Sequence, residues 1–213
     1  MNLSEKNLIA SLSEGTLRDL SEDLIEQVID GPITNDLIRE IPIVKTIKAI
    51  IESGKNIREY FFAKKLCRFL LELREVSLEE RIHMVKRLEE ESDFEEKVGE
   101  RLLHLIDRLD ELSKAQLIGR AFRAYAHGDI GKQDLERLCF AIDRLILVDL
   151  RLIPEFLLKG RIQGRRVQQN LANAGLAFIN SGLGGSWAEP VETCEVFVRY
   201  ILLLDVQPRE NSA

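Results

Sequence analysis

Two side chains with the chemistry of a nuclease site, Arg120 and His127, lie in one predicted helix with six residues between them. On a helix these positions are two turns apart on nearly the same face, about 10 Å along the axis. A histidine there can act as a general base, and an arginine can hold the charge that develops on a phosphate. Tyr125 and Asp129 are near enough in sequence to assist. Such a set would cleave RNA without a metal, by attack of the ribose 2′-OH.

The spacing of this pair fits the loose Arg and His pattern of the helical HEPN ribonucleases. Ala121 departs from that pattern, because the family usually has a polar residue there. Pairs at this spacing also arise by chance. A P-loop, a zinc-binding HExxH motif, a GxSxG motif and a dinucleotide fingerprint are all absent from the sequence. We therefore expect no enzymatic activity and no catalytic residues, with the ribonuclease kept as an alternative.

The metal-ligating residue types are scattered along the chain. The three histidines fall on separate predicted helices: His83, His104 and His127. The stretch AHGDIGKQDL lacks the alternating ligands and the closing Glu of a calcium loop. The three cysteines are far apart and odd in number, which favours buried, reduced thiols over disulfides or a metal site. We expect no metal and no cofactor.

A basic run near the C-terminus suits contacts with phosphates. No acid occurs from residue 159 to 188, and four basic residues begin this stretch: Lys159, Arg161, Arg165 and Arg166. Three amides follow that can hydrogen-bond base edges: Gln168, Gln169 and Asn170. A solvated helix start is the alternative interpretation of the same residues.

The order of signals after residue 160 is that of the second half of a winged helix. A helical stretch ends at NAGL, an apolar run follows, and glycines at 182, 184 and 185 precede a β-branched run. Trp187 is expected at the tip of the turn, where it could stack on a base or a partner. The alternative is a simple loop between two helices.

The segment IPIVKTIKAIIESG, residues 41–54, predicts an amphipathic helix. Pro42 suits its first turn. One apolar stripe recurs at helical spacing: Ile43, Val44, Ile47, Ile50 and Ile51. Lys45 and Lys48 lie on the other side, and seven bases against two acids between residues 45 and 68 give a local balance of +5. With Phe61 and Phe62, this surface can pack against copies of itself or lie on an anionic membrane.

Helical signals dominate the rest of the chain, whose apolar fraction is 45%. Helices are predicted near 56–75, 78–91, 93–111, 114–127 and 132–150. Three pairs have capping-box spacing: Ser77 with Glu80, Ser92 with Glu95, and Ser113 with Gln116. Gly128 is placed to end a helix, and Pro154 marks the end of the helical body. We predict a mainly α protein: a helical bundle over 1–155 and a small mixed α/β module over 156–213, for which a winged helix is one interpretation.

Two long stretches carry a resemblance: IPIVKTIKAIIESGKNIREYFFAKKLCRFLLEL and KVGERLLHLIDRLDELSKAQLIGRAFRAYAHGDI. Over about residues 35–150, apolar spacing, Pro42, Lys64, Lys65 and FRAYAHGDI resemble the small helical proteins of bacterial antiphage operons. The membrane-acting effector of the Hailong defence system is the nearest case. The resemblance implies a helical homo-oligomer that depolarises a membrane when an inhibitory oligonucleotide releases it. Lys45 and Lys48 would then face water in the lumen.

Two functions from different classes follow. The first is a non-enzymatic, self-associating effector or regulator of antiphage defence, of pore or channel type and gated by a nucleic-acid ligand. The second is a winged-helix regulator that binds nucleic acid through Lys159, Arg161, Arg165, Arg166, Gln169 and Trp187. Expected partners are further copies of the chain, an oligonucleotide, an anionic membrane surface and a protein encoded in the same operon. No predominantly apolar window of about 18 residues is free of charge, so no single helix is expected to span a bilayer. We expect a cytoplasmic protein that associates with the inner membrane.

Overall fold

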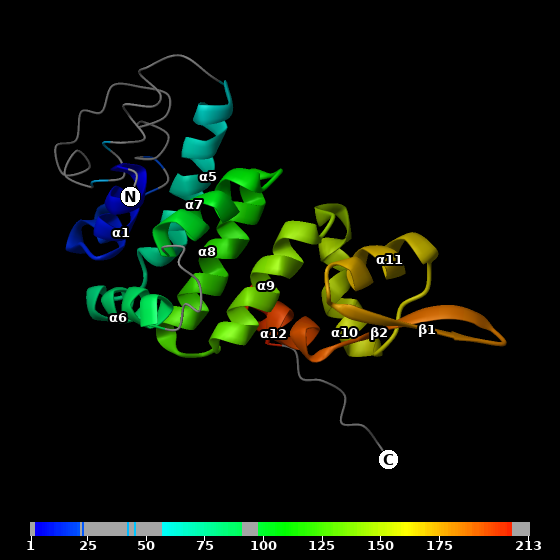
Figure 1. Cartoon of the computed structure of the whole chain (residues 1–213). Coiled ribbons are helices and arrows are strands. Elements are labelled where there is room, and N and C mark those ends of the chain that lie inside the picture. The colour runs from blue at the N-terminus through cyan, green and yellow to red at the C-terminus, as the bar shows by residue number, and fades with distance from the viewer. Residues whose placement is uncertain are drawn as a thin grey trace. The chain divides into compact units, whose positions relative to one another are not determined.

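The chain folds mainly into helices, with one small antiparallel sheet near the C-terminus (Figure 1). The computed structural model describes residues 3–21, 23, 42, 45, 57–90 and 98–205. Within these residues the predicted fold class, a helical bundle with a small α/β appendage, is confirmed. The chain forms two compact units, residues 1–129 and 130–213.

The boundary between the units differs from the one expected at residues 155 and 156. It falls between residues 129 and 130, directly after the helix that Gly128 ends. Pro154 does not end a helical body, because it lies in the first turn of another helix, where its missing N–H removes no helical hydrogen bond. The predicted helix over 132–150 is also shorter than expected and ends at Arg144.

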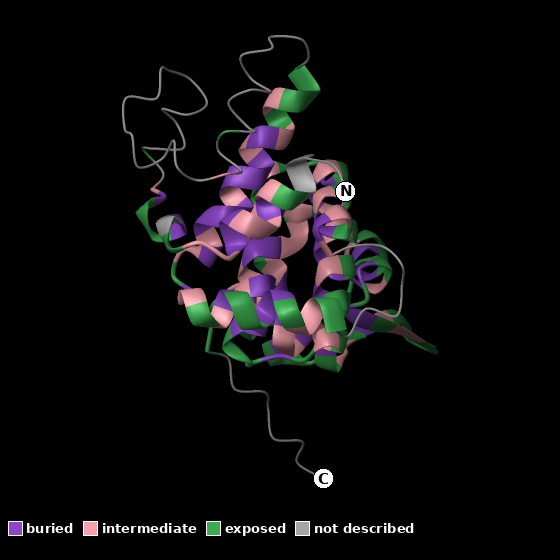
Figure 2. Ribbon diagram, turned by 60° about the vertical axis from the view of Figure 1, so that its left-hand side comes forward, coloured by how far each residue is buried: buried purple, intermediate pink, exposed green. Residues whose placement is uncertain are grey.

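The N-terminal unit is helical throughout its described part. Its elements are α1 (Leu3–Leu12), the short 3₁₀ helix η1 (Gly15–Asp19), α5 (Ile57–Leu73), α6 (Leu78–Glu90), α7 (Val98–Arg108) and α8 (Leu112–His127). The inward faces of these helices carry the buried residues, and the exposed residues lie on their outer sides (Figure 2). The unit is therefore built by burying one apolar face of each amphipathic helix.

The close contact between α5 and α8 centres on Gly119. A Cβ atom at Gly119 would lie 2.7 Å from the Glu72 Cβ and 2.8 Å from the Phe69 carbonyl oxygen, so only glycine fits. One turn along, the rings of Phe69 and Phe122 meet edge to face with their centroids 5.4 Å apart. The carboxylate of Glu72, a residue of this same contact, accepts hydrogen bonds from α8, including one of 2.7 Å from Gln116. Glycine thus brings the two backbones close enough for these side chains to meet.

Two buried lysines stabilise the turn between α7 and α8. Lys65 donates to the carbonyl oxygens of Asp107, at 2.6 Å, and Leu109, at 2.8 Å, which a helix end leaves without internal partners. Burial lowers the pKa of the Lys65 ammonium, although the nearby Asp107 carboxylate raises it. Lys114 binds Asp110 at 2.8 Å in the same turn. These buried cations therefore have hydrogen-bonding partners.

Arg81 of α6 is a contrasting buried cation. Its side chain is fully buried, yet none of its three guanidinium nitrogens has a hydrogen-bond partner among the described residues. Burial lowers the pKa of Arg81, and the positive charge of Arg18 lowers it further. Burying a cation costs free energy unless it is paired, and within the described residues Arg81 has no group that offsets this cost.

The helix ends test the predicted capping residues. The Ser77 box is present, because the Ser77 N–H donates to Glu80 at 2.9 Å and the Glu80 N–H donates to the Ser77 hydroxyl at 3.2 Å. Gly128 ends α8 in the left-handed conformation, with φ of 80°, as predicted. The Ser113 prediction is wrong: α8 begins at Leu112, two residues before the predicted start at 114, and Gln116 binds Glu72 instead of the helix start. Ser92 and Glu95 lie outside the described residues.

The C-terminal unit combines short helices with a β-hairpin. Its elements are α9 (Lys132–Arg144), the 3₁₀ helix η2 (Leu147–Leu152), α10 (Ile153–Lys159), α11 (Arg165–Asn173), β1 (Ala177–Gly182), β2 (Gly185–Pro190) and α12 (Glu192–Tyr200). The largest buried rings are those of Phe156 and Phe197. Helix, strand, glycine turn and strand therefore follow in the predicted order.

The hairpin pairs β1 with β2 from Ala177 opposite Pro190 to Gly182 opposite Gly185. Its turn is two residues long, and Gly185 has a φ of 107°, which a side chain would disfavour. A single bridge between Ile162 and Ala188 brings the segment before α11 alongside β2. The hairpin and the start of α11 are thereby held together.

None of the described helices has both the length and the apolar character needed to cross a bilayer.

Replacing Gly119 with Ala should destabilise the N-terminal unit, because the new Cβ would overlap the Phe69 carbonyl oxygen, which belongs to the backbone and cannot simply rotate away. Overpacking of this kind costs about 1–3 kcal/mol. Thermal unfolding followed by circular dichroism measures the loss. Gly15→Ala is the control, since nothing lies within 4 Å of its added Cβ; equal melting temperatures for the two variants would contradict the close contact.

Candidate nucleic-acid interface

The connection between α10 and α11 contains two glycines with positive φ. Gly160 ends α10 with φ of 71°, and Gly164 precedes α11 with φ of 105°. Both values are in the region that residues with a Cβ rarely adopt. The five residues from 160 to 164 connect α10 to α11, and the middle one, Ile162, pairs with Ala188 of β2.

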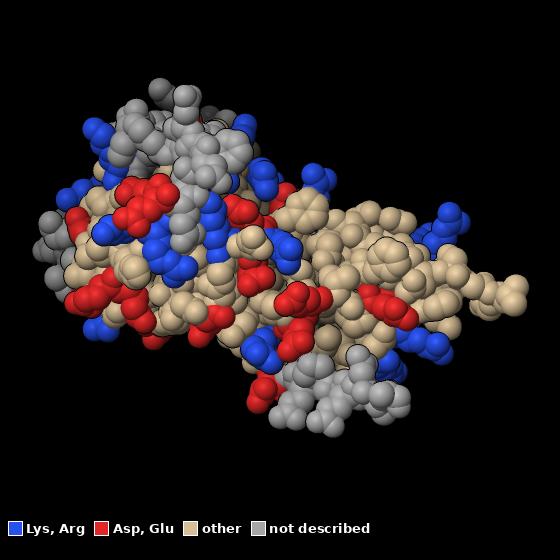
Figure 3. All heavy atoms as spheres, turned by 60° about the horizontal axis from the view of Figure 1, so that its bottom comes forward, with Lys and Arg blue, Asp and Glu red and all other residues tan. Residues whose placement is uncertain are grey.

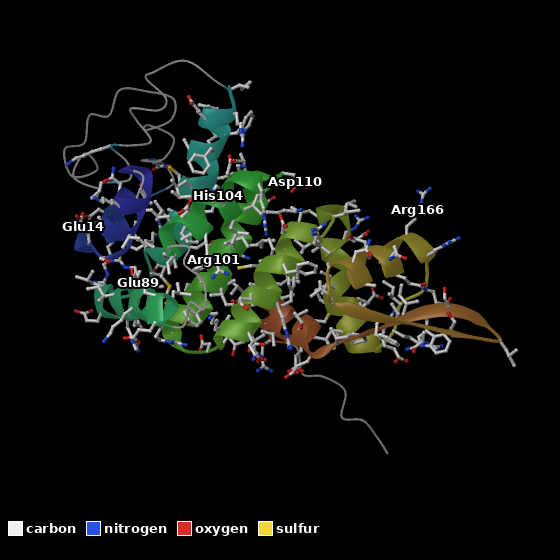
Figure 4. All side chains as sticks on the ribbon, viewed as in Figure 1. Glu14, Glu89, Arg101, His104, Asp110 and Arg166 are labelled. Carbon is white, nitrogen blue, oxygen red and sulfur yellow. The ribbon has the colours of Figure 1, made fainter. Side chains whose placement is uncertain are left out.

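The start of α11 is suited to binding an anion. Gly164 has no side chain to cap the helix, and no acid occurs in the first turn. The first N–H groups of a helix lack internal partners and carry partial positive charge. Arg165 and Arg166 are exposed at this end, and the labelled Arg166 points away from the ribbon (Figure 4). Arg161, Arg165 and Arg166 have no ion-pair partner among the described residues, whereas Lys159 pairs with Glu155.

One face of α11 offers only polar side chains to solvent. Gln169 and Asn173 are exposed on the same side as the helix start, one turn apart, and Gln169 donates to the Asn173 amide oxygen at 2.8 Å. Arginine and glutamine are among the side chains that read base edges in the major groove, and the exposed Asn173 adds a second amide. The predicted site residues Arg165, Arg166 and Gln169 thus lie on one helix surface.

Gln168 and Asn170 do not belong to this surface, which corrects the expectation that they could contact bases. Gln168 is 2% exposed, donates to the Ser186 carbonyl oxygen at 2.9 Å and accepts a hydrogen bond from the Ser186 hydroxyl at 3.0 Å. Asn170 is buried and binds the Asp149 carboxylate at 2.7 Å. Helical periodicity turns these two residues inward when Gln169 faces outward.

Trp187 is in strand β2 and not at the tip of the turn, as had been expected. Its indole N–H donates to Glu189 at 2.9 Å, and its ring lies against Gly182, where an added Cβ would be 3.4 Å away. Asn180, opposite Trp187, also donates to Glu189, at 2.8 Å. The Trp187 ring is only partly exposed, and the tip is formed by Leu183 and Gly184.

Arg120 and His127, the candidate nuclease pair, contact two different carboxylates. Arg120 contacts the Glu72 carboxylate of α5 at 3.4 Å, and Arg123 contacts it at 2.9 Å. His127 Nδ1 lies 3.0 Å from the Glu80 carboxylate of α6. Through these contacts, Arg120 links α8 to α5 and His127 links α8 to α6.

The suggested helper residues have structural roles as well. The Tyr125 ring is fully buried beneath the Arg87 guanidinium, whose carbon is 4.1 Å from the ring centroid. The backbone N–H of Asp129 donates to the Ala124 carbonyl oxygen at 3.0 Å as the helix ends. The Arg120 and His127 pair thus has no convergent set of helpers within the described residues.

The cysteines differ in burial. Cys67 and Cys194 are buried, and burial raises the pKa of each thiol to about 12. These two thiols therefore remain protonated and unreactive at neutral pH. Cys139 is partly exposed, which differs from the expectation that each thiol is buried.

The predicted membrane or oligomer surface is described only in part. Ile43, Val44, Ile47, Lys48, Ile50 and Ile51 lie outside the described residues, while Lys45 is helical and exposed. Phe61 of α5 is 48% exposed and Ile57, one turn earlier, is 75% exposed. Phe62 is half-buried.

Charge is mixed over the face drawn in Figure 3, with acidic and basic side chains interspersed, whereas the projecting end of the hairpin carries neither. Comparison of the chain with protein-family models, with curated proteins and with solved structures found no match.

The contact between Glu80 and His127 should make stability depend on pH. Hydrogen bonds from Ser77, followed by the one from His127, lower the pKa of Glu80 from 4.5 to about 2. A lowered pKa in the folded state means that the stabilisation is complete above about pH 4.5 and is lost as the pH falls through about 2. Glu80→Gln should therefore lower the melting temperature at neutral pH, and the difference from wild type should shrink as the pH falls through that window.

Glu89→Gln is the matched control, because Glu89 is exposed on the same helix (Figure 4). It should leave the melting temperature unchanged throughout. If the melting temperatures of wild type and Glu80→Gln differ by the same amount down to about pH 2, the ionised Glu80 carboxylate does not stabilise the fold.

Proposed function

We propose that the protein is a non-enzymatic regulator that binds nucleic acid through its C-terminal unit. Helix α11 would enter a groove, and the hairpin would contact the adjacent backbone. The observation that carries the proposal is the exposed face of α11, which presents Arg165, Arg166 and Gln169 without any acid. Two helices joined by a five-residue connection and followed by a hairpin also resemble the parts of helix-turn-helix proteins, which is an analogy of fold alone.

Electrostatics support the same proposal locally. The chain has a formal net charge of −6, so its surface as a whole repels polyanions. Two segments are locally basic: residues 45–68, with seven bases and two acids, and residues 159–188, with four bases and no acid. In the second segment the bases adjoin a helix start and exposed amides, so phosphate contacts there would orient a bound duplex.

Replacing both Arg165 and Arg166 with Ala should weaken binding to duplex DNA across all sequences. Each phosphate contact contributes about 0.9 to the slope of log K against log salt, so the slope should fall by about 2. Fluorescence anisotropy with a labelled duplex, titrated at several salt concentrations, measures both quantities.

Arg199→Ala is the control for a general loss of positive charge, because Arg199 is exposed on α12 of the same unit and pairs with Glu195 at 3.1 Å. It should bind DNA as the wild type does. Absence of any wild-type binding at low salt, to duplex or single strand, would refute the proposed function.

One observation favours a second function, the self-associating effector expected from the sequence. Ile57 and Phe61 form an exposed apolar patch on α5, with the Tyr60 ring packed edge to face against Phe61 at 5.9 Å. Large apolar side chains one turn apart are a common way for a helix to contact another copy or a lipid surface. The membrane-active version of this function remains a proposal.

Replacing Ile57 and Phe61 with Ser should reduce both the oligomer measured by light scattering and flotation with anionic liposomes. Ile82→Ser is the matched control, since Ile82 is 46% exposed on α6 without such a neighbour pair. If the wild type is a monomer and does not float with liposomes, the second function is wrong.

A further inference from the structure

The tip of the hairpin carries one aliphatic side chain, that of Leu183, among glycines. Leu183 is 113% exposed, more than in an extended reference chain, so its side chain projects fully into solvent. Three glycines surround it, at positions 182, 184 and 185. Of the residues at the tip, only Gly185 has a positive φ, so the backbone at position 183 accepts most residue types. The turn therefore does not require leucine, and the side chain is free to contact a ligand.

The hairpin is anchored to the helix that carries the arginines. The Gln168 amide of α11 binds the backbone and hydroxyl of Ser186, and Ile162 bridges to Ala188. Ser186 is one residue from Gly185, the last paired position next to the two-residue turn, so the tip lies about two residues, roughly 6–7 Å, beyond the anchor. The hairpin base is thereby held next to the helix that carries Arg165 and Arg166.

The minor groove of duplex DNA is about 6 Å wide and 7.5 Å deep. Two paired strands lie about 4.8 Å apart between their axes, so the ribbon, with the Trp187 ring against Gly182, would lie outside the groove. Glycine at positions 182, 184 and 185 leaves the Leu183 side chain as the part of the tip that could enter. Proteins that bind the minor groove often insert a leucine or a similar apolar wedge between base steps, which unstacks and kinks the duplex.

The exposed amides of α11 favour a nucleic acid over a lipid surface as the occupant. An aliphatic tip beside arginines alone would fit either one. Gln169 and Asn173 can hydrogen-bond to base edges, whereas acyl chains offer them no partner. Arg161, just before the bridge to β2, adds a positive charge beside the strand.

We propose that Leu183 is an intercalating wedge that enters the minor groove of duplex DNA and unstacks a base step. This inference rests on the proposed function of α11 and names its ligand as a duplex deformed at one step. Steps that unstack easily, such as TA, should be preferred even though no side chain reads their edges. The arginines would supply most of the affinity, and Leu183 would supply the deformation.

The test uses the full-length protein and a short duplex containing 2-aminopurine at a TA step. Binding of the wild type should raise the fluorescence of 2-aminopurine, because unstacking relieves its quenching. Leu183→Ala should abolish this rise while leaving the salt dependence of binding unchanged. Leu183→Met, which keeps an apolar side chain of similar length, should retain the rise.

The outcomes distinguish the role of Leu183 from nucleic-acid binding by α11. If the wild type binds no duplex, the proposed function fails and the wedge fails with it. If the wild type binds but Leu183→Ala gives the same fluorescence, the wedge is wrong and the function of α11 stands. If Leu183→Ala instead loses binding to vesicles of anionic lipid and the duplex shows no unstacking, the tip is a lipid contact and the wedge is again wrong.

Discussion

The buried amide of Gln168 is the interaction on which the geometry of the C-terminal unit depends. It joins the second turn of α11 to the backbone and hydroxyl of Ser186, and it also donates to the Ile162 carbonyl oxygen at 3.3 Å. A two-stranded hairpin is marginally stable by itself in water. The hydrogen bonds to Gln168 and the Ile162 bridge hold the base of the hairpin against α11, and this attachment relates the position of its tip to the helix face.

Neighbouring amide residues of α11 differ in burial and in the groups that they contact. Gln168 and Asn170 are buried and satisfy backbone groups in the hairpin and near η2, while Gln169 between them faces solvent. Three consecutive amides therefore have two kinds of function. Because buried polar groups must be hydrogen-bonded, the two inner amides fix the fold and only the outer one is left for a ligand.

In the N-terminal unit, the polar side chains that resemble a catalytic set are structural ties between helices. Glu72 and Glu80 each accept bonds from α8, and they draw Arg120 and His127 to different helices, α5 and α6. Close packing at Gly119 brings α8 near enough to α5 for Glu72 to reach its partners. Spacing along one helix is a poor guide to convergence, because the partners come from other elements.

The sequence by itself determined the helical class, the Ser77 box, the Gly128 helix end and the order of helix, strand, glycine turn and strand. These features depend on local periodicity, capping and glycine conformation, which are written within a few neighbouring residues. Only the tertiary structure decided that Gln168 and Asn170 turn inward, that Trp187 folds onto β1 against Gly182, and that Leu183 forms the tip. It also placed the unit boundary at residue 129. Each of these outcomes depends on which distant backbone or carboxylate a side chain meets, and that pairing is fixed by packing rather than by sequence spacing.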